Sequence, residues 1–267
     1  MKEFVLELIR KKHGFNVKLN TMREYLQAYV LRVMYEEGVF RAAAFIGDTA
    51  LRFLYGLPRF SEDLDFSALD KSRIDFLKLI KKIENELILA GYDISVSYND
   101  RETVNSAFIK FEHLMYEGGL SPLKSQKFSV KLEIDTKPPA GAALKTYIVN
   151  KYFPIAFLSY DRESLFAGKL GALLGRKYTK GRDFFDLGWY LSKWPGLSPN
   201  IVFLNNTLKQ SGWHKESISR DNWRDFIYRV VQKADWKEVK QDVINFLENP
   251  GDIKIFSKEN ILGLIRS

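Results

Sequence analysis

The sequence predicts an α/β N-terminal half followed by an all-helical C-terminal half. Helical spacing and strand-like alternation of apolar residues succeed one another up to about residue 160. From Asp161 onward only helical spacing recurs. The length of 267 residues allows one large domain or two modest ones. We therefore expect an α/β domain with N-terminal helices over 1–160 and a helical domain over 161–267.

Composition restricts the class of protein. Hydrophobic residues make up 46% and charged residues 28% of the chain, which is ordinary for a folded globular protein and excludes disorder. The absence of cysteine excludes disulfides and thiolate metal sites. No apolar run approaches the roughly 18 residues of a membrane span, and glutamates interrupt the apolar start of the chain, which argues against a signal peptide. We expect a cytoplasmic protein without a membrane partner.

The net charge of +8 favours polyanionic partners, because basic side chains displace counterions from phosphate backbones. Solubility alone is an equally good explanation of this excess.

The N-terminal half alternates helices and strands. Helices are expected at 21–37 and 48–55, strands at 41–46, 64–68, 94–98, 107–111 and 128–135, and a further strand or hairpin at 145–157. The strand at 128–135 alternates cleanly. Its apolar residues lie on one face, and the other face carries Ser129, Lys131, Glu133 and Asp135.

A long amphipathic helix is expected between the second and third of these strands. Ser72 and Asp75 resemble a capping box at its start, and Gly91 ends it. The apolar stripe predicted to be buried consists of Ile74, Leu77, Ile80, Ile83, Leu87 and Ile88. The C-terminal half is expected to form helices over 161–177, 182–193, 201–210, 222–233 and 236–249.

The stretch from Phe45 to Ser67 carries the chemistry. Asp63 and Asp65 lie two apart at the start of a strand, so their side chains point the same way. Two carboxylates on one face repel each other unless a cation lies between them, and Mg²⁺ binds such oxygen ligands together with substrate phosphates. A solvated acidic turn before a strand is the alternative interpretation of an isolated Asp-x-Asp.

The surrounding residues resemble a known motif. Gly47, Thr49-Ala50-Leu51, Pro58-Arg59-Phe60-Ser61-Glu62 and Asp63-Leu64-Asp65-Phe66 match, in order and spacing, the nucleotidyltransferase motif of the AbiEii-type toxins. This family is part of the polymerase-β-like nucleotidyltransferase superfamily. The resemblance implies a mixed-sheet nucleotidyltransferase core with a helical C-terminal domain, and an active site in the cleft between them.

The resemblance also assigns roles around the Gly47 turn. In the superfamily the backbone of this turn approaches the nucleotide phosphates at a helix N-terminus, which implies nucleotide binding by Gly47, Asp48 and Thr49. Asp48 departs from the pattern, which has glycine or serine there. An aspartate makes a good N-cap, but it adds negative charge near the expected triphosphate. Either it reaches the metal or it weakens binding of the donor nucleotide.

A third carboxylate is expected from a neighbouring strand. Glu133 resembles the family's acidic position, as a metal ligand and general base, and Asp135 on the same face is the second choice. A charged outer sheet face is the alternative for either residue.

The helical half holds a second similarity. Lys169, Arg176, Arg182, Asp183 and Asp186 match the family's Lys … Arg … Arg-Asp-x-x-Asp segment. The resemblance implies that Lys169 and Arg176 bind the triphosphate and that Asp183 orients it or a metal-bound water. Ion pairs that fix a helical hairpin are the alternative. The basic loop with Lys177, Lys180 and Arg182, and with Tyr178 among them, suits contact with a single-stranded nucleic-acid end or is simply solvated.

Together these matches imply an enzyme that uses Mg²⁺ and moves a nucleoside monophosphate from an NTP to a hydroxyl, with release of pyrophosphate. The family implies a toxin with an RNA acceptor, such as the 3′ end of tRNA, and a cognate antitoxin. Nucleotide transfer to a protein, or a catalytically silent nucleotide- or RNA-binding protein, are the alternatives.

Overall fold

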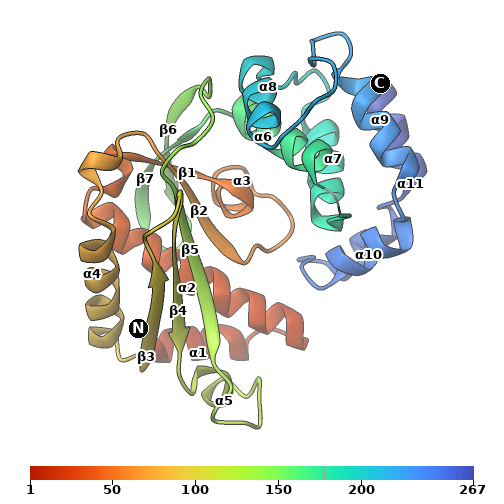
Figure 1. Ribbon diagram of the computed structural model, residues 1–267. Coiled ribbons are helices and arrows are strands. Elements are labelled where there is room, and N and C mark those ends of the chain that lie inside the picture. Colours follow the sequence, from red (N-terminus) through yellow and green to blue (C-terminus); the bar gives the residue numbers. More distant parts are fainter. Residues whose placement is uncertain (177) are drawn as a thin grey trace. The chain divides into compact units, whose positions relative to one another are not determined.

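The computed structural model describes residues 1–176 and 178–267 (Figure 1). Lys177, which the sequence placed at a helix end and in a basic loop, lies outside the described residues. The chain divides into two compact units. Unit 1 comprises Met1–Gly56, Phe60–Pro138 and Lys145–Ser159, and unit 2 comprises Leu57–Arg59, Pro139–Leu144 and Tyr160–Ser267.

Unit 1 is built on a mixed sheet with the strand order β3-β4-β5-β2-β1-β7-β6. β2 pairs with β5 in parallel and with β1 antiparallel, while β1 pairs with β7 in parallel. The elements are α1 (Lys2–Arg10), α2 (Phe15–Glu36), η1 (Val39–Arg41), β1 (Ala43–Ile46), α3 (Gly47–Tyr55), β2 (Asp63–Ala68), η2 (Lys71–Arg73), α4 (Phe76–Leu89), β3 (Ile94–Asn99), β4 (Val104–Phe111), α5 (Leu114–Glu117), β5 (Phe128–Asp135), β6 (Leu144–Asn150) and β7 (Pro154–Tyr160).

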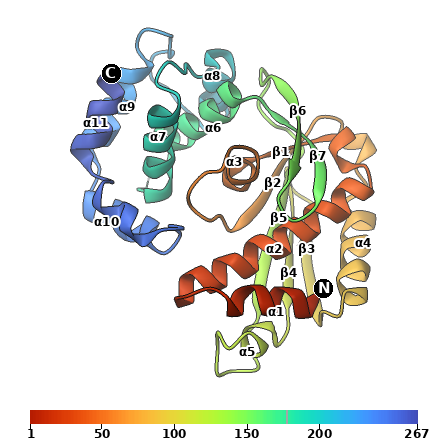
Figure 2. The same ribbon diagram turned by 180° about the vertical axis from the view of Figure 1, so that it is seen from behind.

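Helices α1, α2 and α4 cover one face of this sheet (Figure 2). The core between them is a single apolar cluster, in which the inward residues of β2 and β5, such as Leu64 and Leu132, meet Val30 of α2 and Ile83 of α4. The alternation of β5 explains this arrangement, because every second residue of the strand points into the cluster.

Unit 2 is helical. Its elements are α6 (Arg162–Gly175), α7 (Gly181–Lys193), α8 (Ile201–Gln210), α9 (Trp223–Lys233), α10 (Trp236–Ile244), η3 (Pro250–Lys254) and α11 (Lys258–Arg266). Its core forms where α6, α7 and α9 meet: Phe166 stacks on Tyr190 with ring centroids 4.6 Å apart and contacts Trp223 edge-on. The predicted α/β fold with a mixed sheet and a helical C-terminal region is confirmed.

The start of α4 was predicted wrongly. Ser72 caps no long helix; it lies in η2, where Asp70 accepts a hydrogen bond from its backbone N–H. Asp75 is the N-cap of α4 and accepts a hydrogen bond from the backbone N–H of Lys78. Because Asp75 has extended backbone angles, helical geometry begins only at Phe76.

Two members of the predicted stripe of α4 are also wrong. Leu77 and Ile88 are exposed, and the buried face is formed by Phe76, Leu79, Ile80, Ile83 and Leu87. Each exposed residue directly follows a buried one and is turned about 100° away from it around the helix axis. Helix α10 ends at Ile244 rather than at 249, the bounds of α1 were not predicted, and the short helices α5 and α11 were not expected.

A buried ion network holds α2 against α3. Glu24 of α2 is 5% exposed and accepts hydrogen bonds from Arg52 of α3, from Lys151 at 2.8 Å and from the Tyr152 hydroxyl at 2.9 Å. Burial raises the pKa of Glu24, but the positive charges of Arg52 and Lys151 outweigh burial and hold the pKa below its ordinary value of 4.5. Gln27, one turn further along α2, donates to the carbonyls of Ser61 and Glu62 and so fixes the loop before β2.

Glu24→Gln should lower the free energy of unfolding by about 3 kcal/mol near pH 7, because it leaves buried cations without their anion. A carboxylate whose pKa is lower in the folded than in the unfolded protein stabilises the fold at pH values above its unfolded-state pKa. This stabilisation is lost as the pH falls through the folded-state pKa. The difference between wild type and variant should therefore shrink as the pH drops below 4.5. Urea unfolding of wild type and Glu24→Gln across this pH range measures the difference in the free energy of unfolding.

Glu3→Gln, an exposed change on α1, is the control. A difference independent of pH would contradict the assignment.

A second buried pair fixes the 57–59 segment within unit 2. The guanidinium of Arg59 donates two hydrogen bonds of 2.6 Å to the carboxylate of Asp186 on α7, and both side chains are fully buried. A short bridge between Arg59 and Leu247 and a hydrogen bond from the backbone of Glu248 to Pro58 add backbone contacts. The segment between α3 and β2 is thereby part of the helical unit.

Arg59→Met should destabilise unit 2 by about 3 kcal/mol, because the buried Asp186 loses its bidentate partner. Calorimetric unfolding measures the loss. Arg73→Met, in the exposed turn η2, is the matched control and should leave the unfolding temperature unchanged. Equal stability of the two variants would show that Asp186 needs no guanidinium.

Candidate functional site

Two neighbouring strands bring the predicted carboxylates side by side. In the parallel pairing of β2 with β5, Asp63 lies opposite Lys131 and Asp65 lies opposite Glu133. Residues in register on adjacent strands point to the same face of the sheet. Asp63, Asp65 and Glu133 therefore occupy one patch, in which Asp65 and Glu133 are directly opposed, about 5 Å apart from strand to strand.

The core side of β2 holds this patch in place. Leu64 and Phe66 are fully buried, and the Phe66 ring stacks on Phe45 of β1 at 5.3 Å between centroids. Because the side chains of a strand alternate, anchoring Leu64 and Phe66 in the core forces Asp63 and Asp65 to the opposite face. Both aspartates are half-buried.

Lys131 places a positive charge among these carboxylates. Its Nζ lies 2.8 Å from Oε1 of Glu133. Partial burial lowers the pKa of Lys131, but the hydrogen bond to Glu133 and the charges of Glu133, Asp63 and Asp65 outweigh burial and raise the pKa above its ordinary value. The patch is thus a cluster of three anions and one cation.

The turn at Gly47 approaches the cluster closely. Gly47 has φ +76°, and a Cβ built on it would lie 2.5 Å from Oδ2 of Asp65. Only glycine satisfies both the left-handed backbone and this contact. The Thr49 hydroxyl donates a 2.5 Å hydrogen bond to the carbonyl of Asp63, so Thr49 ties α3 to the first residue of β2.

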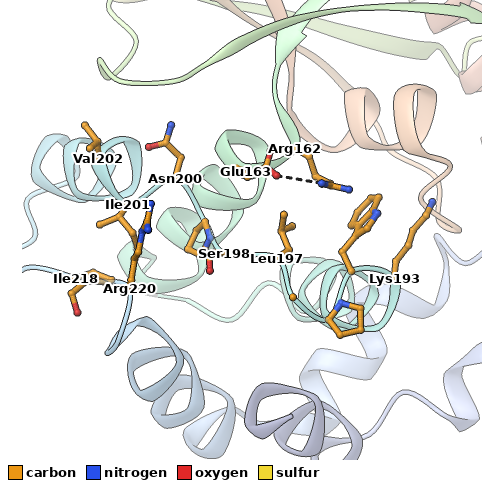
Figure 3. Close-up of a pocket in the computed structure, with 15 residues that line it drawn as sticks. Arg162, Glu163, Lys193, Leu197, Ser198, Asn200, Ile201, Val202, Ile218 and Arg220 are labelled. Atoms are coloured by element: carbon orange, nitrogen blue, oxygen red, sulfur yellow. Dashed lines mark hydrogen bonds and ion pairs between the residues drawn. The ribbon is translucent and has the colours of Figure 1, made fainter.

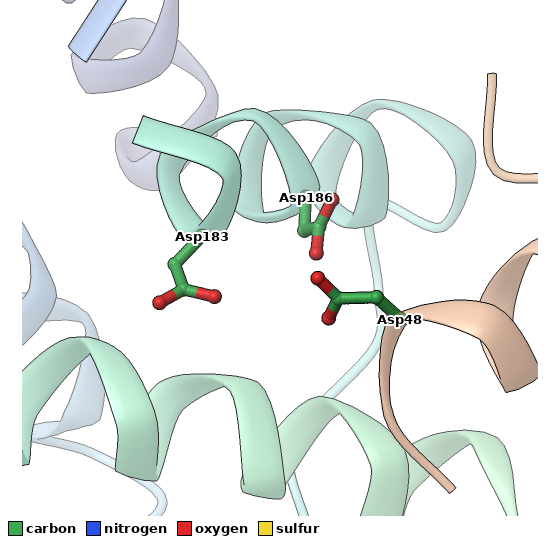
Figure 4. A group of neighbouring side chains, drawn as sticks. All are labelled: Asp48, Asp183 and Asp186. Carbon is green, nitrogen blue, oxygen red and sulfur yellow. The ribbon is translucent and has the colours of Figure 1, made fainter. Parts of the chain in front are cut away.

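Asp48 is not the N-cap that its residue type suggested. Ile46 is the N-cap residue of α3, and Asp48 lies in the first helical turn, half-buried (Figure 4). The helix begins one residue earlier than expected because Gly47 already adopts the turn from β1 into α3. A carboxylate in a first turn still interacts favourably with the helix dipole.

Of the two candidates for a third carboxylate, Glu133 lies beside Asp65, whereas Asp135 lies opposite Ser67 at the other end of the pairing. Oδ1 of Asp135 also accepts a 2.8 Å hydrogen bond from the backbone N–H of Lys137. The geometry therefore favours Glu133.

The residues predicted in the helical half form a buried ion cluster within unit 2. Asp183 and Asp186 project from the same side of α7 (Figure 4). Lys169 of α6 contacts both, at 3.2 Å from Asp183 and 2.7 Å from Asp186, and Arg176 lies 2.9 Å from Asp183. These contacts match the ion-pair alternative and join α6 to α7. With Arg59 the cluster contains three cations and two anions, and Arg176 is the most exposed of the cations.

Unit 2 also contains a cavity of about 1080 Å³ with basic walls (Figure 3). Arg162, Lys193 and Arg220 contribute positive charge to it, and Arg162 donates a 3.3 Å hydrogen bond to Glu163. The guanidinium of Arg162 and the ammonium of Lys193 each lie 5.0 Å from the Trp194 ring centroid. Cations around an indole form a surface suited to polyanions with aromatic groups.

Sequence reasoning missed two residues. Lys131 was noted on the strand face and within the segment that resembles the family's Lys-x-Asp/Glu pattern, but it was given no role in the site. Arg59 was noted only as part of the motif. Its burial needed the contact with Asp186, which lies 127 residues away in the chain. No local signal predicts that pair.

Two solved structures share the fold of this chain. The structure resembles a candidate nucleotidyltransferase of Helicobacter pylori, with TM-score 0.53, 19% identity and coverage of 91% of this chain and 92% of the other. It also resembles JHP933 from Helicobacter pylori, with TM-score 0.53, 16% identity and coverage of 92% and 90%. At these identities the likeness shows the fold. No curated protein matches the chain.

Among the residues described, no helix is both long and apolar enough to cross a lipid bilayer. The family model for the nucleotidyl transferase AbiEii toxin of type IV toxin–antitoxin systems matches residues 30–256, which confirms the resemblance seen in the motif. That match spans the β2–β5 carboxylates and the ion cluster of unit 2 alike, and the chain belongs to the AbiEii family of nucleotidyltransferase toxins.

Proposed function

We propose that this nucleotidyltransferase uses Mg²⁺ to transfer a nucleoside monophosphate from an NTP to a hydroxyl of RNA, with the 3′ end of tRNA as the acceptor that the family resemblance suggests. The observation that carries the proposal is the register of β2 and β5, which sets Asp63, Asp65 and Glu133 side by side next to the Gly47 turn. Family membership implies a cognate antitoxin.

The donor set fits a hard divalent cation. Asp63, Asp65 and Glu133 offer only carboxylate oxygens, and Mg²⁺ binds to one or two carboxylates together with substrate phosphates. When bound, the ion would neutralise charge on the triphosphate and on the leaving pyrophosphate. Asp63 and Asp65 would hold it, with Glu133 completing the site.

The chain's own residues would then position the reactants. The backbone N–H groups at the start of α3 would face the phosphates, since Gly47 leaves no side chain between this turn and Asp65. The acceptor oxygen would attack the α-phosphorus, the bond to the bridging oxygen would break, and pyrophosphate would leave. Glu133 would take the hydroxyl proton, with Lys131 orienting its carboxylate.

The choice of RNA as acceptor is supported by charge. The chain carries a net charge of +8, and the cavity of unit 2 is lined by Arg162, Lys193 and Arg220. Basic groups of this kind bind phosphate backbones in a salt-dependent way. The triphosphate-binding roles of Lys169, Arg176 and Asp183 remain predictions.

Asp65→Asn should lower Mg²⁺-dependent transfer of α-labelled NTPs to RNA by about 100-fold or more, because one charged metal ligand is lost. The assay compares all four NTPs on total RNA, and calorimetric titration of Mg²⁺ gives a second readout. Asp100→Asn, an exposed change in the β3–β4 loop, is the control and should keep full activity.

The same assay separates the alternatives. Label in protein bands and not in RNA would identify a protein acceptor and refute the RNA proposal. Binding of RNA without any transfer would indicate a catalytically silent protein. Equal activity of Asp65→Asn and wild type would show that transfer does not need the Asp65 carboxylate on β2.

Gly47→Ala and Gly56→Ala form a matched pair at the two ends of α3. Both glycines have left-handed backbones, with φ +76° and +72°, so either substitution should cost about 1–2 kcal/mol of stability. Only the Cβ at residue 47 meets Asp65; nothing lies within 4 Å of a Cβ at residue 56. Gly47→Ala should therefore lower kcat/KM by about 10- to 100-fold, whereas Gly56→Ala should retain it.

Steady-state kinetics of the two variants, with unfolding curves for both, measure this difference. Equal loss of activity in both would attribute the effect to general strain and not to displacement of the Asp65 carboxylate.

A further inference from the structure

A row of side chains crosses the sheet away from the carboxylates. Lys131 of β5 lies opposite Asp63 on one side and opposite Phe108 of β4 on the other. Residues in register on adjacent strands share a face, so Phe108, Lys131 and Asp63 form one line on the face opposite the helices. The Lys131 ammonium lies 5.6 Å from the centroid of the Phe108 ring.

Phe108 is exposed although it lies in the middle of a strand. Its neighbours Ala107 and Ile109 are fully buried in the core, whereas Phe108 is 40% exposed. The residue opposite it on β3 is Ser97, and the residue two positions before it on the same face is Ser106. These small polar side chains leave the phenyl ring uncovered.

Lys110 lies on the same face, two residues beyond Phe108 on β4. It is half-buried and opposite Ser129. No described residue forms an ion pair or hydrogen bond with its ammonium group. An aromatic ring is therefore flanked by two lysines, of which Lys131 contacts Glu133 and Lys110 has no anionic partner in the described chain.

We propose that Phe108 stacks on a base of the single-stranded 3′ end of the acceptor RNA and that Lys110 contacts its phosphate backbone. The inference rests on the proposed function, and it names the surface that presents the acceptor hydroxyl to Asp63 and Asp65. An exposed ring with flanking cations is the combination that binds single strands without reading their sequence, because every base has a π-face.

The spacing suits this role. Phe108 lies two strand positions from Asp63, which is about 10 Å at the ordinary strand separation. That distance corresponds to roughly three stacked base spacings of 3.4 Å. A strand whose terminal hydroxyl lies at the carboxylates would therefore place one of its last bases over the ring. A paired duplex end could not offer an unstacked base to it.

Fluorescence anisotropy measures the binding of a short fluorescein-labelled single-stranded RNA in the absence of Mg²⁺ and NTP. The transfer assay separately gives the KM for RNA and the KM for NTP. Phe108→Ala should weaken RNA binding by about 5- to 100-fold and raise the KM for RNA, with the KM for NTP unchanged. Phe108→Trp should restore binding. Lys110→Gln should lower the slope of log affinity against log salt by about one.

Tyr98→Ala is the matched control. Tyr98 is an exposed aromatic residue of the adjacent strand β3, but it lies opposite the buried Ala107 and so faces the other side of the sheet. It should bind RNA like wild type. A hairpin RNA with a closed end should bind Phe108→Ala and wild type equally.

The outcomes separate the two proposals. If Phe108→Ala and Tyr98→Ala bind single-stranded RNA as wild type does, or if wild type binds no RNA, the stacking role is overturned. If wild type binds the oligonucleotide through Phe108 but never labels RNA, the stacking surface stands and the proposed transfer to RNA fails. If only protein becomes labelled and Phe108→Ala is fully active, both fail.

Discussion

The parallel pairing of β2 with β5 is the contact on which the candidate site depends. It sets Asp65 and Glu133 about one strand spacing apart, with Asp63 two residues along β2 on the same face. Such an arrangement is electrostatically unfavourable in a partly buried place, so the fold must hold it by other means. The buried Leu64 and Phe66 on the core side, and the ammonium of Lys131 on the other, do so.

The same constraint extends to α3. Gly47 permits the backbone to touch the Asp65 carboxylate, and Thr49 binds the Asp63 carbonyl. The Glu24 network then fixes α3 to α2, and Gln27 fixes the loop that leads into β2. Some residues that resemble a catalytic motif are thus structural, since the side chains of Thr49, Leu64 and Phe66 hold the two aspartates in place. Preorganised carboxylates need little rearrangement when charge develops during phosphoryl transfer.

Unit 2 is organised around charges that are buried in pairs. Arg59, Lys169 and Arg176 surround Asp183 and Asp186, and Arg59 and Asp186 are inaccessible to solvent. Buried ion pairs add little net stability compared with apolar packing, but losing one partner is costly. Charges that must find each other also specify one packing of α6 on α7. Arg59 is part of the conspicuous motif for this structural reason, since a fully buried guanidinium is unable to contact a substrate.

Much of the fold followed from periodicity. The strand β5 was predicted from its alternation, β1 from a short apolar run, and the helices α2, α3 and α6–α9 from helical spacing. Other elements were missed although their signal was present. Helices α1 and α11 have nine residues each and bury one apolar face, formed by Val5, Leu6 and Ile9 in α1 and by Ile261 and Ile265 in α11. At the start of α4, two overlapping capping signals competed, and Asp75 prevailed over Ser72.

The sequence by itself determined the family and the acidic pair at the centre of the candidate site. Asp63 and Asp65, two residues apart with apolar neighbours, can only share one face of a strand, and the motif around them is long enough to be specific. The tertiary structure decided which residues join them. Strand order and register are set by contacts between distant segments. Only the folded chain therefore shows Glu133 beside Asp65 and Lys131 among the carboxylates. The same holds for Phe108 at the end of their row and for Arg59 against Asp186.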